Sequence, residues 1–400
     1  MKTFTKYITL IMILVAIPSC GEKEQPTGGL GIKMDGIVLG FDKNLIKADG
    51  NDEVTFTAYL DGKNVDGQAT IYTKGKTGKF TEKVGKIFST TQPGNYEFIV
   101  MYKTKKSDPV VVSAVSRDIP SSVADPQPSK TSFVHRTFFN QYTGVECPNC
   151  PYMVHLLDQT LVNGYEDKVV LACIRNYSSK DTDFGFASVS RAAYYPFLKI
   201  DYSTSYEYSD RASAAELQSL IDKWTSTTAK VGISANPVYY EDGQIIVKVS
   251  VKAAETGDYH VGLWLMQDEF CLPQSFKNPT TGALGGTWNT GYKGDPTKNR
   301  YDYHHNAVRV AASEYMGAHV GFPLGRIEAG KTASWTFLVN VRLEGDDVTS
   351  GWWEIAPGVN KVNLNDLHFA AFVTSRKNKG YTVDNVIDFK YNEARPFDYK

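Results

Sequence analysis

Two cysteines stand three positions apart in the stretch TGVECPNCPYM, which runs from Thr143 to Met153. A C-x-x-C turn is tight enough for Cys147 and Cys150 to form a redox-active pair, to bind one metal together, or to close a disulfide that only stabilises the turn. The spacing is compatible with all three kinds of chemistry. The elements predicted around the pair therefore have to distinguish among them.

The sequence around the pair predicts a strand, the C-x-x-C turn, a helix and a second strand, in that order. SFVHRTFFNQY has the apolar residues of a buried strand, and apolar residues recur at helical spacing from Met153 to Leu161. KVVLACIRN is a continuous apolar run, which is typical of a strand buried on both faces of a parallel sheet. A thioredoxin-like fold places its cysteines in such a unit, with the first sulfur at the helix N-terminus.

In that setting Cys147 is the attacking thiol and Cys150 the resolving one, because the free N–H groups of a helix start stabilise a thiolate. A thioredoxin-like site also contains a cis proline that faces the sulfurs. Pro196, in AAYYPFLKIDY, is the candidate because a strand-like run follows it. Glu146 stands where a tryptophan is usual, and its charge should raise the pKa of Cys147. Redox activity and a structural disulfide both stay open.

A zinc site is the weaker interpretation of the C-x-x-C. A closed zinc site needs about four ligands, and the sequence has no second C-x-x-C or matching pair of cysteine and histidine. His304 and His305 are adjacent in RYDYHHNAVRV, so on a strand they point to opposite faces and cannot easily share a metal. Cys173 is expected to be a buried small side chain, and Cys271 has no evident partner. No cofactor is predicted.

The beginning of the chain is typical of a secretory signal. Basic residues precede an apolar run from Ile8 to Ile17, and small residues follow up to Cys20. Cys20 resembles the lipidated residue of a bacterial lipobox, and GEKEQP resembles the tether of surface-exported lipoproteins of the Bacteroidota. We expect a signal peptide at 1–19, a flexible tether at 20–31 and a lipid anchor in the outer membrane, facing the cell surface. An ordinary signal peptide with an incidental cysteine is the alternative.

Composition places the rest of the chain among ordinary globular proteins. Of the 400 residues, 42% are hydrophobic and 22% are charged, as in ordinary globular proteins. The chain is long enough for two or three domains. Without the signal, 41 basic and 44 acidic side chains remain. Nucleic acid is therefore not an expected partner, because nucleic-acid binding requires a basic face.

The pattern along the chain predicts a multidomain protein with α/β and all-β parts. Alternating strands and turn dipeptides at 32–116 indicate an immunoglobulin-like β-sandwich, and 117–131 is a linker rich in proline and serine. The thioredoxin-like unit at 132–228 ends with a helix capped by Ser213. The return of alternating patterns at 229–400 predicts a C-terminal β-sandwich.

Three segments together resemble a known family, the Bacteroidota lipoproteins related to the 28-kilodalton outer membrane protein. They are QYTGVECPNCP, HHNAVR and the closing FAAFVTSRKNKGYTVDNVIDFKY. The resemblance covers about Phe133 to Asn392, and the immunoglobulin-like domain is an N-terminal addition to it. The order of polar residues in HHNAVR departs from the family pattern, so no role is carried onto these histidines. The resemblance implies a surface lipoprotein of the outer membrane with poorly defined activity.

Two functional hypotheses follow. In the first, the protein is a thiol-disulfide oxidoreductase of the cell envelope: Cys147 attacks a protein disulfide, Cys150 resolves the mixed disulfide, and Pro196 shapes the docking edge. In the second, it is a non-catalytic surface protein that binds ligands or acts as an adhesin, and its C-x-x-C is structural. Both hypotheses include the membrane as a partner through the lipid anchor.

Overall fold

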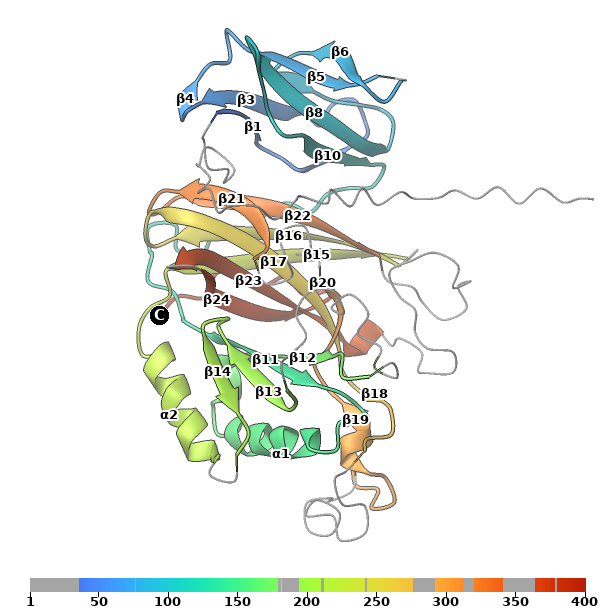
Figure 1. The fold of residues 1–400 in the computed structure, drawn as a ribbon, viewed down its shortest axis with the longest axis vertical. Helices are drawn as coiled ribbons and strands as arrows, with labels where there is room; N and C mark the ends of the chain where they lie inside the picture. The colour runs from blue at the N-terminus through green and yellow to red at the C-terminus, as the bar shows by residue number, and fades with distance from the viewer. Residues whose placement is uncertain are drawn as a thin grey trace, which may run out of the picture.

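The computed structural model describes residues 36–75, 77–178, 181, 194–209, 212–241, 243–275, 292–311, 320–340, 364–377 and 380–400. Cys20, the signal and the tether lie outside these residues. The described chain is rich in β-structure and forms several sheets, and its two α-helices lie at one end of the molecule (Figure 1). Neither of these helices is long and apolar enough to cross a membrane.

The N-terminal part forms a β-sandwich. One sheet contains β1 (Ile37–Phe41), β3 (Val54–Leu60), β4 (Lys63–Asn64) and β7 (Ile87–Phe88). The other contains β2 (Leu45–Lys47), β10 (Val110–Val115), β8 (Gly94–Tyr102), β5 (Thr70–Lys74), β6 (Phe80–Val84) and β9 (Lys105–Lys106). Buried and half-buried residues alternate along β3, as the period-two pattern predicts. The rings of Phe56 and Phe98, one from each sheet, meet in the core with centroids 4.6 Å apart.

A second sandwich lies below the first in Figure 1. One of its sheets contains β15 (Val231–Tyr240), β16 (Gln244–Ala253) and β22 (Thr332–Asn340), all antiparallel. Its core joins this sheet to strands β17 (Gly257–Gln267), β21 (Phe322–Ile327), β23 (Leu367–Lys377) and β24 (Gly380–Lys390). Apolar side chains such as Val249, Leu263 and Phe369 fill the space between the two layers.

One long sheet of the described chain contains strands from both of the units predicted at 132–228 and 229–400. Its order is β14 (Thr204–Glu207), β13 (Phe197–Ile200), β11 (Thr137–Thr143), β12 (Val169–Arg175), β20 (Ala307–Ala311), β17, β23 and β24. Strand β12 is parallel to β11 and pairs with β20 at Cys173 and Ala307. The units predicted at 132–228 and 229–400 therefore share one sheet, because the free edge of β12 is covered by a strand from the later unit.

Two helices cover one face of this sheet at its β11–β14 end. Helix α1 (Cys150–Thr160) and helix α2 (Ala214–Thr225) bury Leu157 and Leu217 against the strands, and Phe139 faces them from β11. The predicted cap of α2 is present, because the Ser213 side chain accepts a hydrogen bond from the Glu216 N–H at 3.2 Å. Short elements complete the chain: η1 (Glu166–Lys168), β18 (Phe270–Cys271), η3 (Arg300–Asp302), β19 (Tyr303–His304) and η5 (Leu364–Asp366).

The segment at 117–131 forms no helix or strand, and it is not a free tether. It lies along β15 and β16, where the amide of Asn236 on β15 donates to the Ser121 carbonyl and Lys252 on β16 forms an ion pair with Asp125 at 2.8 Å. Pro120 is buried. The sequence pattern did not indicate these contacts, because the partners lie more than a hundred residues away in the chain.

Candidate functional site at the Cys147–Cys150 disulfide

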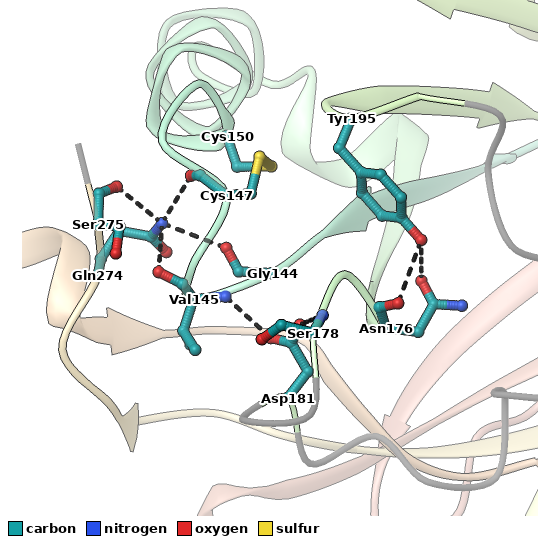
Figure 2. The surroundings of a disulfide bond; sticks show 10 residues. All are labelled: Gly144, Val145, Cys147, Cys150, Asn176, Ser178, Asp181, Tyr195, Gln274 and Ser275. Carbon is teal, nitrogen blue, oxygen red and sulfur yellow. Dashed lines mark hydrogen bonds between the residues drawn. A yellow bond between two sulfur atoms is a disulfide. The ribbon is translucent and has the colours of Figure 1, made fainter. Parts of the chain in front are cut away.

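The two cysteines of the C-x-x-C motif are joined by a disulfide with an S–S distance of 2.11 Å (Figure 2). Both residues are buried, with Cys147 1% and Cys150 0% exposed. An attacking thiol must be accessible to its partner disulfide. The burial of the pair therefore limits the access of another thiol or disulfide to either sulfur.

The helix begins one turn later than the sequence predicted. Cys147 was expected at the helix N-terminus, but α1 begins at Cys150, with Asn149 as its cap residue. A turn precedes it, in which the Cys150 N–H donates to the Cys147 carbonyl at 3.3 Å. Pro148 lies in this turn, outside the helix. The positive end of the helix dipole is thus closer to Cys150 than to Cys147 along the chain.

The backbone of the loop before the helix is held from one side by Gln274. Its Nε2 lies 3.2 Å from the carbonyl oxygen of Gly144 and 3.1 Å from those of Val145 and Cys147 (Figure 2). The Ser275 N–H also donates to the Val145 carbonyl, at 2.7 Å. Sequence reasoning missed this contact, since Gln274 is distant in the chain and no local pattern marks it.

Asp181 holds the same loop from another side. Its carboxylate accepts hydrogen bonds from the N–H groups of Val145, at 2.8 Å, and Ser178, at 2.7 Å. Burial raises the pKa of Asp181, and these hydrogen bonds oppose that effect. A Cβ atom at Gly144 would lie 2.3 Å from the Cβ of Tyr177 and 2.6 Å from Oδ2 of Asp181. Only glycine fits at position 144.

Pro196 directly precedes strand β13, which pairs with β11, and the Tyr195–Pro196 peptide bond is cis. Tyr195 belongs to the surroundings of the disulfide, and its hydroxyl donates to the side-chain oxygen of Asn176 (Figure 2). Glu146 is half-buried in the turn before Cys147. Because disulfide sulfurs do not titrate, the predicted influence of Glu146 on the pKa of Cys147 concerns the reduced protein alone.

The other candidate residues lie at several places. His304 is buried, with Nε2 3.0 Å from the Leu272 carbonyl oxygen, whereas His305 is exposed, as their opposite directions predict. Cys173 is buried as expected, and its thiol donates to the Gln141 side-chain oxygen at 3.2 Å. Cys271 is half-buried and is not part of a disulfide. Within the described ranges, no three His, Cys, Asp or Glu side chains are grouped as metal ligands.

The described residues thus define a β-rich protein with several sheets and a buried disulfide at the start of a helix. No protein-family model and no curated protein matches the sequence. Among solved structures, the chain is similar to HBP35 of Porphyromonas gingivalis, with a TM-score of 0.45 and 13% identity over 67% of this chain and 78% of that chain. It is also similar to a domain of the outer membrane lipoprotein Omp28 from Porphyromonas gingivalis, with a TM-score of 0.22 and 15% identity over 41% of this chain and 89% of that chain.

Proposed function

We propose that the protein is a lipid-anchored binding protein on the surface of the outer membrane, and that its Cys147–Cys150 disulfide is structural. The proposed anchor is Cys20, on the pattern of the signal segment that precedes it. The N-terminal sandwich is proposed to be an immunoglobulin-like spacer. The unit at 132–228 is proposed to be a thioredoxin-like scaffold, supported by the order strand, C-x-x-C, helix, strand and by the position of Pro196 before β13.

The observation that carries the structural role of the disulfide in this proposal is the burial of both cysteines. Thiol-disulfide exchange requires an external thiol or disulfide to reach a sulfur atom. Cys147 and Cys150 are 1% and 0% exposed, and the loop that contains Cys147 is bound to Gln274 and Asp181. The geometry thus favours a bond that stabilises the loop.

Thiol-disulfide exchange is the second candidate function, and the position of the pair at the start of α1 favours it. Once reduced, a thiolate there would be stabilised by the free N–H groups of the first helical turn. Cys147 would attack a protein disulfide, Cys150 would resolve the mixed disulfide, and Pro196 would shape the docking edge.

Insulin reduction separates the two functions. The full chain is assayed with dithiothreitol as electron donor, next to the Cys147→Ser variant and a thioredoxin as positive control. We expect the wild-type chain and the variant to give the same background rate, because no substrate reaches the sulfurs. Turnover that is lost in Cys147→Ser would show that the pair is catalytic and would overturn the proposal of a structural disulfide.

A further inference from the structure

The N-terminal sandwich has one end at which the described chain begins and two tight turns meet. Strand β1 begins opposite the end of β3, and the turn at 61–62 then leads into β4 (Figure 1). Asp61 of this turn accepts a hydrogen bond from the Gly36 N–H at 2.8 Å. The turn at 103–104, between β8 and β9, lies beside it, since Lys105 Nζ is 4.0 Å from Oδ2 of Asp61. We call this end, with Gly36 and both turns, the entry end of the sandwich.

Exposed lysines are grouped at the entry end. They lie in the two turns or on the short strands that follow them: Lys63 on β4, Lys103 in the turn at 103–104, and Lys105 and Lys106 on β9. Lys63 directly follows the turn that contains Asp61, and the Asp61 carboxylate is 4.0 Å from Lys105, so the lysines of both turns are neighbours. Clustered charges of one sign create a local potential that attracts the opposite charge. The entry end therefore favours an anionic partner.

Neighbouring carboxylates leave most of this positive charge unneutralised. Asp66, in the loop after β4, is already paired with Lys86 at 2.6 Å. Among the described residues, Lys63, Lys103 and Lys106 form no ion pair. The ammonium groups of Lys103 and Lys106 lie over aromatic rings, 5.3 Å and 5.1 Å from the ring centres. Such contacts orient an ammonium group and leave its charge in place.

The proposed anchor joins the described chain at this same end. The residues from Gly21 to Asp35 separate Cys20 from Gly36 in the sequence. A chain of this length spans at most about 55 Å, whatever its conformation. If Cys20 carries the lipid, the membrane surface is held within reach of the lysines, whereas a soluble anion has to be recruited from solution. The place at which the chain enters the sandwich thus favours a lipid surface as the anionic partner.

We propose that the entry end of the N-terminal sandwich docks on a lipid surface whose headgroups carry anionic phosphates. The ammonium groups of Lys63, Lys103, Lys105 and Lys106 would lie against the phosphates, in the way that basic clusters next to a membrane bind anionic lipids. This inference rests on the proposed lipid anchor, which keeps the surface close, and it adds an orientation of the protein on the membrane. Salt screens such a contact, so it supplements the lipid and does not replace it.

The test is cosedimentation of the unlipidated chain, Gly21 to Lys400, with lipid vesicles. Vesicles that contain one part phosphatidylglycerol and two parts phosphatidylcholine are compared with vesicles of phosphatidylcholine alone. We expect binding to the anionic vesicles in about 20 mM NaCl and its loss in about 500 mM NaCl, because the higher salt screens exposed charges within a few ångströms. No binding to the anionic vesicles, or equal binding to the phosphatidylcholine vesicles, overturns the inference.

Two triple variants locate the contact. The first replaces three lysines of the entry end: Lys63→Gln, Lys103→Gln and Lys106→Gln. Each lysine near an anionic surface contributes about fivefold in affinity, so vesicle binding should fall at least tenfold. The matched control makes the same change of net charge at three exposed lysines outside the N-terminal sandwich: Lys223→Gln, Lys331→Gln and Lys390→Gln. It should bind within about twofold of the wild type, and equal losses in both variants would show that net charge alone governs binding, which contradicts the proposed contact.

Lys103→Glu tests the same end with a single change, even if the triple variant does not fold. It should weaken vesicle binding far more than Lys331→Glu does, because it places a negative charge against the phosphates, and equal effects would exclude the entry end. Binding to soluble dextran sulfate without binding to the anionic vesicles would assign the lysines to an acidic polymer and overturn the lipid proposal. The vesicle experiments use a chain without lipid. Their failure refutes the docking surface alone, whereas retention of Cys20→Ser on membranes after a high-salt wash refutes the anchor alone.

Discussion

The ammonium group of Lys252 lies beneath the segment at 117–131, on a side chain that is 2% exposed. It donates to Asp125 at 2.8 Å, to the Pro128 carbonyl at 2.6 Å and to the Tyr399 hydroxyl at 3.2 Å. Burial alone would lower the pKa of Lys252, but the hydrogen bonds to Asp125 and Tyr399 raise it. One charged residue thus joins the segment, strand β16 and the C-terminus.

Lys252→Met should lower the free energy of unfolding by about 2–4 kcal/mol, because it removes the cation paired with Asp125 and the hydrogen bonds to the Pro128 carbonyl and the Tyr399 hydroxyl. Urea denaturation measures the change. The control is Lys248→Met, on the same face of β16, where the side chain is half-buried and we expect a change below about 1 kcal/mol. Equal effects of both substitutions would show that the contacts of Lys252 do not stabilise the fold.

His368 lies in a group of charges at the ends of three strands. Its Nδ1 is 2.6 Å from Oδ2 of Asp388, and its Nε2 is 3.6 Å from Oδ1 of Asp268. Burial alone would lower the pKa of His368, but its interactions with Asp268 and Asp388 raise it to about 10. Burial alone would raise the pKa of Asp268, but its hydrogen bonds to His305 and His368 lower it.

The raised pKa of His368 predicts a pH dependence of stability. A raised folded-state pKa stabilises the protein fully below the unfolded value of about 6.5, and this contribution is lost as the pH rises through about 10. The wild type should therefore lose more stability between pH 7 and 10 than His368→Gln does. Urea titrations at several pH values measure both slopes. Parallel slopes would contradict the raised pKa.

At the scale of elements, the loop between β11 and α1 is held by residues that are distant in the sequence. Gln274 and Asp181 bind its backbone, and Gly144 leaves no room for a side chain. The loop is therefore held in one conformation by groups that the local sequence does not reveal.

Gly144→Ala should destabilise the protein by about 1–3 kcal/mol, because the added Cβ meets Tyr177 and Asp181 at distances that force the loop to shift. Thermal unfolding measures the loss. Gly380→Ala is the control, since a Cβ there would have no heavy atom within 4 Å. If Gly144→Ala unfolds at the wild-type temperature, the loop is not closely packed.

Local patterns predicted the elements well where the responsible contacts are also local. The alternation of buried residues in β3 and the cap of α2 by Ser213 could both be predicted from the sequence, because periodicity and capping depend on residues within a few positions. The hydrogen bonds from Gln274 to the loop before α1 could not be predicted from the sequence. Nor could the pairing of β12 with β20, which joins Cys173 to Ala307 across more than a hundred residues.

At the scale of the whole molecule, the N-terminal sandwich rests on the second one (Figure 1). The Asn44 side chain binds the backbone of Thr336 twice, donating to its carbonyl at 2.7 Å and accepting from its N–H at 3.0 Å. The ring of Phe41 lies 6.2 Å from that of Trp335. Together with the packed segment at 117–131, these contacts make the sandwich part of a continuous structure.

The proposed anchor makes a prediction for the whole protein in cells. Cys20→Ser should move the protein from the membrane fraction to the soluble fraction, because the lipid would be lost and neither described helix can span a membrane. Fractionation followed by immunoblotting measures the distribution, with Cys271→Ser as a cysteine control that should stay with the membrane. Sedimentation of Cys20→Ser with membranes after a high-salt wash would refute the anchor.

The most direct test of the account is the alkylation rate of each cysteine in the folded, mildly reduced chain, measured by mass spectrometry. If the Cys147–Cys150 bond is structural, it should stay oxidised or react no faster than buried Cys173, whereas Cys271 is half-buried and should react first, although burial raises the pKa of its thiol. Reduction under mild conditions, with Cys147 alkylated much faster than Cys271, would contradict a structural disulfide and identify an attacking thiol.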